Sequence, residues 1–166
     1  GVAAGDPAAA ARACAEADGL VDGVGDPWLV VHMQAMLGGV AQSAGRHSDA
    51  CEHFSLAAEA ADRLGFAGSR AYHLVNLGRA EQQCGHLDAS AVVLRRALDT
   101  ARGAGDLRLS ALARVWLAMG LRRQHHDGEA LALAREAQRW YAASGGGDHA
   151  GLADCLVATM DAATSR

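Results

Sequence analysis

Histidine and cysteine are the residue types in this sequence best suited to metal chemistry. The chain has 8 histidines and 4 cysteines among its 166 residues. Cys51 and His53 are two positions apart, which on a helix points them to different sides. His125, His126 and Asp127 are consecutive, and adjacent side chains diverge too much for a tetrahedral site. We therefore expect surface or packed side chains here, with no metal site and no cofactor.

Sequence motifs for catalysis are missing. The run Gly145-Gly146-Gly147-Asp148 lacks the Gly-Lys-Ser/Thr sequence that holds a nucleotide phosphate, so we interpret it as a helix linker. Neither the Gly-x-Ser-x-Gly motif of hydrolases nor the His-Glu-x-x-His motif of zinc proteases occurs. We expect that this chain is not an enzyme.

The net charge limits which classes of partner we expect, and the cysteine spacing indicates the cellular compartment. The net charge of -4 and the pI of about 6.0 give no broad basic surface, so we expect no direct binding of nucleic acid. The cysteines form no Cys-x-x-Cys pair, and no apolar run is long enough for a membrane span or a signal peptide. We expect a cytoplasmic location without membrane contact. Because the chain begins without Met, we interpret it as part of a longer protein.

A 40-residue period organises the sequence. Leu37, Leu77 and Leu117 lie 40 residues apart, and a small residue follows each of them. The same spacing relates four further sets: Ala10, Ala50, Ser90 and Ala130; Cys14, Phe54, Leu94 and Ala134; Ala17, Ala57, Ala97 and Ala137; and Gly25, Gly65, Gly105 and Gly145. A period of this length is typical of stacked helical repeats.

Each period contains two helical stretches, because apolar residues recur at steps of three and four. With 51% hydrophobic and only 4% aromatic residues, the core must consist mainly of alanine, leucine and valine, which favours an all-α fold. We expect eight helices, at about 7–23, 27–44, 47–64, 69–84, 87–103, 107–124, 128–143 and 149–163.

Helix ends and helix packing follow from particular residues. Asp6 and Asp26, each before a proline, as well as Ser69, Asp106 and Asp148, are predicted to cap helix starts. The recurring glycines are predicted to end helices in the left-handed conformation. Gly38 and Gly78 lie inside expected helices, where each costs about 1 kcal/mol relative to alanine. We therefore predict a close approach of the partner helix at both glycines, with the backbones nearly in contact.

The pattern of Leu37-Gly38 followed by Ala50, Phe54 and Ala57 resembles the tetratricopeptide repeat (TPR). The resemblance runs from about residue 6 to residue 159. It implies a right-handed α-solenoid of antiparallel helix pairs, which forms a single array over residues 1–166. The expected units are a half repeat at 6–25, repeats at 26–65, 66–105 and 106–145, and a half repeat at 148–163.

Two features depart from the usual TPR pattern. The period is 40 residues where 34 is usual, and Gln34, Leu74 and Arg114 occupy the position of the first-helix tryptophan. HEAT-like repeats, whose period is near 40, therefore remain an alternative for the details of the fold. The longer period is similar to that of the TPR arrays in large bacterial signal-dependent transcriptional regulators, where the arrays adjoin nucleotide-binding and DNA-binding domains.

The resemblance also implies a ligand groove, because the first helices of TPR arrays line the concave face. The matching positions are His32, Met36, Tyr72, Asn76, Arg79, Gln83, Trp116, Met119 and Arg123. Asn76 matches an asparagine that clasps a ligand peptide's backbone in the family, and its amide both donates and accepts. Arg79, together with Arg122 or Arg123, would hold a carboxylate, while Trp116 and the two methionines would contact an apolar group.

The expected function is thus a scaffold that binds a protein or peptide segment carrying an acidic and an apolar residue. Such a module would be the sensor or partner-binding part of a larger regulator. The alternative is a structural spacer with no groove ligand, which packs on sister domains or forms homo-oligomers through its exposed ends.

Overall fold

The protein is all-helical throughout the part of the chain described by the computed structural model, residues 16, 19 and 25–164. Its seven helices there are α2 (Pro27–Ser43), α3 (His47–Arg63), α4 (Ala67–Cys84), α5 (Leu87–Gly103), α6 (Leu107–Arg123), α7 (Asp127–Ala143) and α8 (Ala150–Thr164). Each boundary lies within two residues of the one expected from the sequence, which confirms the all-α prediction. The helix expected at 7–23 lies almost wholly outside the described residues.

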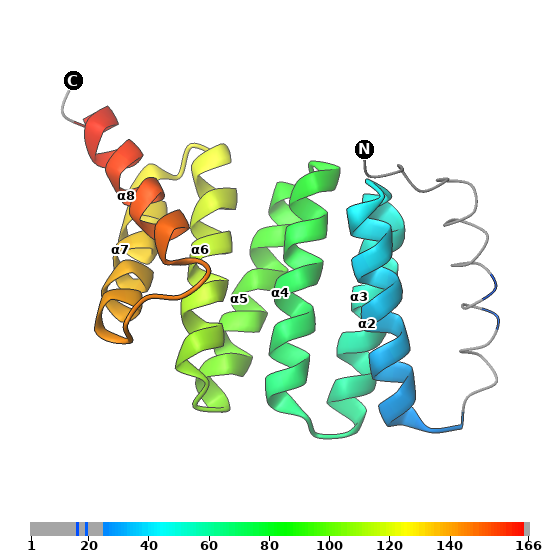
Figure 1. Cartoon of the computed structure of the whole chain (residues 1–166). Helices are drawn as coiled ribbons and strands as arrows, with labels where there is room; N and C mark the ends of the chain where they lie inside the picture. The colour runs from blue at the N-terminus through cyan, green and yellow to red at the C-terminus, as the bar shows by residue number, and fades with distance from the viewer. Residues whose placement is uncertain (1–15, 17–18, 20–24, 165–166) are drawn as a thin grey trace, which may run out of the picture.

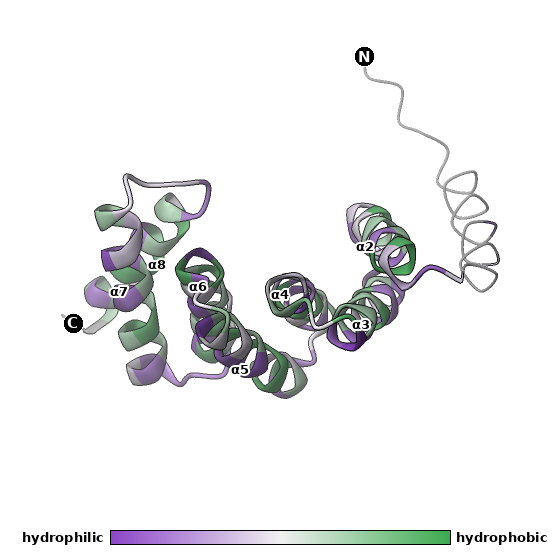
Figure 2. Ribbon diagram, turned by 90° about the horizontal axis from the view of Figure 1, so that it is seen from below, coloured by the Kyte–Doolittle hydropathy of each residue, from purple (hydrophilic) through white to green (hydrophobic). Residues whose placement is uncertain are grey.

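Helices that follow one another in the chain pack against one another (Figure 1). Viewed from below, they form two rows, with α2, α4, α6 and α8 in one row and α3, α5 and α7 in the other (Figure 2). Within the first row α4 packs directly on α6, whereas α2 makes no comparable contact with α4. No helix among the described residues is long and apolar enough to cross a membrane.

Side-chain caps start two of the helices as expected. Asp26 accepts a hydrogen bond from the Trp28 amide at 2.9 Å, with Pro27 in the first turn, and Asp106 accepts from the Leu109 amide at 2.8 Å. The predicted cap by Ser69 is wrong, because α4 begins two residues earlier, at Ala67. The helix α8 begins at Ala150, so that Asp148 lies one residue too early to cap it. Asp6 lies outside the described residues.

Left-handed residues end the helices. Gly65, Gly105 and Gly145 have φ values of 69°, 69° and 84°, which confirms the prediction for these three. Gly25, the first member of the same set, has no positive φ and stands directly before the capping residue Asp26.

The two glycines inside helices admit a large side chain from the following helix. A Cβ atom added at Gly38 would lie 2.8 Å from Phe54 Cδ1, and one added at Gly78 would lie 2.5 Å from Leu94 Cγ. The predicted close approach is therefore present, but side-chain atoms occupy the space where we expected backbone. The buried Ser90 hydroxyl adds a hydrogen bond of 2.8 Å to the Gly78 carbonyl. Each glycine thus joins two consecutive helices.

Candidate functional site

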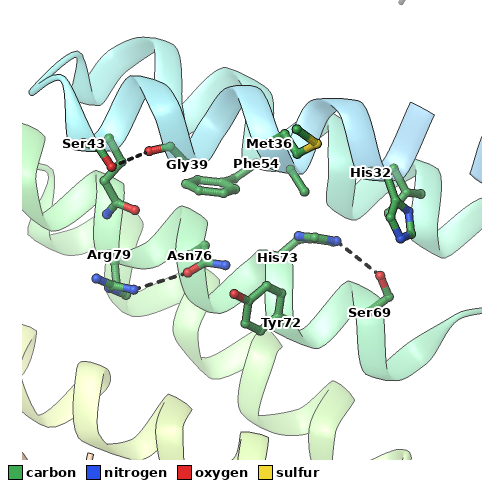
Figure 3. A pocket seen from close by; sticks show the side chains of 13 residues that line it. His32, Met36, Gly39, Ser43, Phe54, Ser69, Tyr72, His73, Asn76 and Arg79 are labelled. Carbon is green, nitrogen blue, oxygen red and sulfur yellow. Dashed lines mark hydrogen bonds between the residues drawn. The ribbon is translucent and has the colours of Figure 1, made fainter. Parts of the chain in front are cut away.

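A groove of about 580 Å³ lies between α2 and α4 (Figure 3). Its walls come from one face of each of these helices, and its floor includes Phe54 of α3. The lining residues are Val31, His32, Ala35, Met36, Gly39, Gln42, Ser43, Phe54, Ser69, Tyr72, His73, Asn76 and Arg79. The groove therefore combines an apolar floor with polar groups along α4.

The next helix pair has a bridging contact at a register where the groove is open. Between α4 and α6 the residue at the register of Gln42 is Gln82, which is 3% exposed and whose Nε2 donates to the Trp116 carbonyl at 2.8 Å. This contact needs Gly120, because a Cβ there would lie 2.8 Å from Gln82 Nε2. The residues 40 positions earlier are Gln42 and Ala80, and alanine carries the methyl group that Gly120 lacks. Gln42 accordingly lines the groove instead of bridging two helices.

Arg79 differs from the other half-buried arginines of the described chain by having no carboxylate partner. The other three each contact one: Arg46 contacts Asp49, Arg70 contacts Asp62 and Arg114 contacts Glu136. Arg79 instead donates to Asn76 Oδ1 at 3.4 Å, and its guanidinium lies 4.4 Å from the centre of the Trp116 ring. Its Nε is buried without a hydrogen-bond partner. The stacking on tryptophan stabilises the cation but leaves it without a counter-ion.

The electrostatic character of the groove is positive. No aspartate or glutamate is among its lining residues, whereas Arg79 is. Burial lowers the pKa of Arg79, and Tyr72 acts in the opposite direction. The guanidinium nevertheless stays charged, because arginine does not lose its proton in proteins. A group that enters beside Arg79 is favoured when it brings negative charge.

His73 is a neutral polar group in the wall of the groove. It is only 5% exposed, its Nε2 lies 3.2 Å from the Ser69 hydroxyl, and its Nδ1 is buried without a partner. Burial, with a smaller contribution from His32, lowers the pKa of His73 to about 4. The imidazole is therefore uncharged at neutral pH, which leaves Arg79 as the principal charge of the groove.

The rim of the groove carries exposed apolar and aromatic side chains. Met36 is 71% exposed, and Tyr72 is about half exposed. His32 stacks on Trp28 with ring centres 3.9 Å apart and lies within hydrogen-bond distance of the Trp28 carbonyl. These side chains offer contact area beside the cation.

The structure brings five of the expected groove residues together and places the other four elsewhere. His32, Met36, Tyr72, Asn76 and Arg79 all line the groove. The remaining four have other surroundings: Trp116 lies under Arg79, Met119 packs against the core, Gln83 is exposed, and Arg123 donates to the Gln82 carbonyl at 2.8 Å. The expected pairing of Arg79 with a second arginine does not arise within the groove, because neither Arg122 nor Arg123 lines it.

Several lining residues are not among those expected from the sequence, and Phe54 and His73 are two of them. Phe54 is buried and packs against Gly38, and its ring also forms part of the groove floor. His73 lies three residues before Asn76, and this spacing places both on one helical face. That spacing is the signal that could have identified His73.

Comparison with known proteins adds no family assignment. No protein-family model matches the chain, and no curated protein matches its sequence. Within the described residues, no group of three His, Cys, Asp or Glu side chains could hold a metal ion.

Proposed function

We propose that the chain is a right-handed α-solenoid of the TPR type and acts as a peptide-binding scaffold. The 40-residue period, the packing of helices in chain order and their arrangement in two rows support this proposal. The groove between α2 and α4 is the binding site, and its ligand is an extended segment of a partner protein.

Arg79 carries the argument for the ligand's chemistry. It is the one half-buried arginine in the described chain without a carboxylate, in a groove without acidic lining residues. A ligand carboxylate would supply the missing charge, and charge-assisted hydrogen bonds of this kind contribute about 1.5–3 kcal/mol. The Asn76 amide can hold a backbone carbonyl of the ligand, while Met36 and Phe54 contact an apolar side chain. The ligand is thus a peptide with one acidic and one apolar residue.

The proposed biological setting is based on the resemblance to the TPR arrays of bacterial regulators. A peptide-binding array of this period fits the sensor or partner-binding part of a larger cytoplasmic bacterial regulator, and neither catalysis nor a cofactor is part of the proposal. Other domains of such a regulator would make the contact with DNA.

The test is selection of peptides from a random display library with the immobilised protein, followed by calorimetric titration of the selected peptides. We expect selected peptides to share an acidic residue next to an apolar one. The double variant Asn76→Ala/Arg79→Gln should bind them at least about tenfold more weakly, because the charge-assisted contact is lost. Arg122→Gln is the matched control, since Arg122 is exposed, bonded to Thr159 and absent from the groove. Equal loss in both variants, or selected peptides without an acidic residue, contradicts the proposal.

One observation favours the alternative of self-association. Helix α2 leaves Trp28, Leu29 and Val40 between 41% and 51% exposed, which is a large apolar surface for one helix. Under this alternative, sedimentation analysis would find a dimer for the wild type and a monomer for Leu29→Asp/Val40→Asp. A monomeric wild type at high concentration would remove the alternative and leave the groove proposal intact.

A further inference from the structure

Two half-buried cysteines meet where α3 packs against the end of α4. Cys51 lies in the second turn of α3, and Cys84 is the last residue of α4. The Ser48 hydroxyl, one helical turn before Cys51 on the same face, lies 3.9 Å from Cys84 Sγ. Glu81 and Cys84 both lie close enough to the Cys51 thiol to raise its pKa. The two sulfur atoms are therefore neighbours across a helix interface.

The next helix pair repeats the contact between Ser48 and Cys84. The residues 40 positions after Ser48 and Cys84 are Asp88 and Gln124. Gln124 Nε2 donates to Asp88 Oδ1 at 2.5 Å, across the equivalent interface between α5 and α6. The contact between these two registers is thus a regular feature of the packing, and between α3 and α4 it places Cys84 beside the turn of α3 that leads to Cys51.

We propose that Cys51 and Cys84 form a dithiol site that reacts with low-molecular-weight disulfides and closes to a disulfide bond between α3 and α4. No metal or cofactor is needed, because the small disulfide is the oxidant. The site is distinct from the groove, and this inference does not depend on the proposed peptide ligand.

The reaction has two balanced steps. In the first, the Cys84 thiolate attacks one sulfur of the small disulfide, a protein–S–S–R bond forms, and RS⁻ leaves and takes up the proton that Cys84 lost. In the second, Cys51 loses its proton to solvent and attacks the Cys84 sulfur, which forms the Cys51–Cys84 bond and expels the second RS⁻. Two protein thiols are oxidised, and one small disulfide is reduced to two thiols.

The surroundings of Cys51 set the order of the two steps. Burial, followed by the nearby Glu81 and Cys84, raises the pKa of Cys51 to about 12. The thiolate is the nucleophile in this chemistry, so that Cys51 attacks slowly at neutral pH. Cys84 is therefore modified first, and the mixed disulfide accumulates before Cys51 resolves it.

Closure of the bond would act on the groove indirectly. Helix α4 carries Asn76 and Arg79, while α3 supplies Phe54 of the groove floor. A covalent link between these helices fixes their relative position at the end of α4. The oxidised protein thus has one wall of the groove tied to its floor.

The test follows each cysteine separately by peptide mass spectrometry. The full chain is treated with oxidised glutathione at pH 7.0, freed of excess reagent, and then incubated at pH 7.5 or 9.0. We expect the glutathione adduct on Cys84 to be replaced by a link between tryptic peptides 47–63 and 80–95. This closure should be about thirtyfold faster at pH 9.0, because the thiolate fraction of Cys51 rises tenfold per pH unit below its pKa.

Cys155 and one variant provide the controls. Cys155 is exposed on α8, so its adduct should form and persist at both pH values. In Cys51→Ala the Cys84 adduct should persist as well, and an unchanged circular dichroism spectrum would show that this variant is folded. The proposal is overturned if the wild-type Cys84 adduct is as stable as that on Cys155, if Cys51 is modified first, or if Cys155 reacts while Cys84 does not.

Discussion

Complementary residue sizes recur at one point of each helix pair. Gly38 faces Phe54 and Gly78 faces Leu94, while the third pair has Ala118 and Ala134 at the same registers, both fully buried. The two large side chains of the second helices face glycine, whereas Ala134 faces the register of Ala118. Interiors are packed closely enough that such pairs must change together.

The Gly78→Ala substitution should therefore destabilise the protein. Although alanine is the better helix former by about 1 kcal/mol, its Cβ would meet Leu94 Cγ at 2.5 Å, and overpacking costs about 1–3 kcal/mol. We expect a net loss of about 1 kcal/mol in the free energy of unfolding, measured by urea denaturation. Gly78→Ala/Leu94→Ala recreates the pair found at Ala118 and Ala134, so its loss should be smaller than the sum of the two single losses. Strictly additive losses would contradict the account.

The buried His73 should make stability depend on pH. Its folded pKa is about 4, below the ordinary value of 6.5, so near pH 5 the unfolded chain binds a proton that the folded protein does not. Stability is then complete above pH 6.5, falls as the pH decreases toward 4 and levels off below that. The decrease should amount to about 3 kcal/mol or less. In urea titrations His73→Gln should flatten this dependence, while His126→Gln, in an exposed turn, should retain it.

At the scale of the element, the ends of α2, α4 and α6 depend on one left-handed residue each. Gly45 and Gly85 have φ values of 75° and 86°, and His125 takes the equivalent place with a φ of 62°. A residue with a side chain is strained in this conformation by about 1–2 kcal/mol. The turn after α6 therefore forms at a higher conformational cost than the turns after α2 and α4.

Opposite substitutions at Gly85 and His125 should change the free energy of unfolding in opposite directions. Gly85→Ala should lower the free energy of unfolding by about 1 kcal/mol, because alanine is strained where φ is positive. His125→Gly should raise it by a few tenths to about 1 kcal/mol, since relief of strain exceeds the added freedom of the unfolded chain. Urea midpoints measured side by side check both signs. Destabilisation by His125→Gly would mean that the histidine makes a compensating contact.

At the scale of the whole molecule, the packed pair α4 and α6 differs from the open pair α2 and α4 at one register, which holds Gly120 in the first case and Ala80 in the second. Gln82 bridges α4 and α6 because Gly120 leaves space for its amide, and Gln42 lines an open groove opposite Ala80. The difference of a single methyl group thus coincides with the difference between a packed interface and a candidate binding site. The groove is formed by two helices that are not consecutive in the chain, so no single helix determines it.

Matched alanine substitutions test this difference. Gln82→Ala should destabilise the protein by about 1–3 kcal/mol, because it removes a part-buried hydrogen bond and leaves the Trp116 carbonyl without this donor. Gln42→Ala, at the same register, should change stability by less than about 0.5 kcal/mol, since it faces the groove. Thermal and urea unfolding of both variants provide the measurement. Equal effects would show that the two interfaces do not differ in the way described.

Local signals and the period were enough to predict the helices of the described chain. Apolar spacing, the caps Asp26 and Asp106 and the left-handed glycines act within a few residues of each boundary, so they are legible in the sequence. Ser69 was misassigned because a capping residue type is also common inside a first turn, where its hydroxyl here meets His73 instead. Register also predicted that Gly38 and Gly78 are contact points, but not which atoms would fill the space.

The all-helical class and the identity of the close-packed positions were determined by the sequence alone, because both arise from residue spacing along one or two helices. Only the tertiary structure decided where the groove lies, that Arg123 is bonded to the end of α4, and that Arg79 has no carboxylate partner. It also brought Cys51 and Cys84 together from different helices. These features depend on how far apart two helices settle and which side chains meet between them. A methyl group at one register can change that distance, and no local spacing rule records its effect.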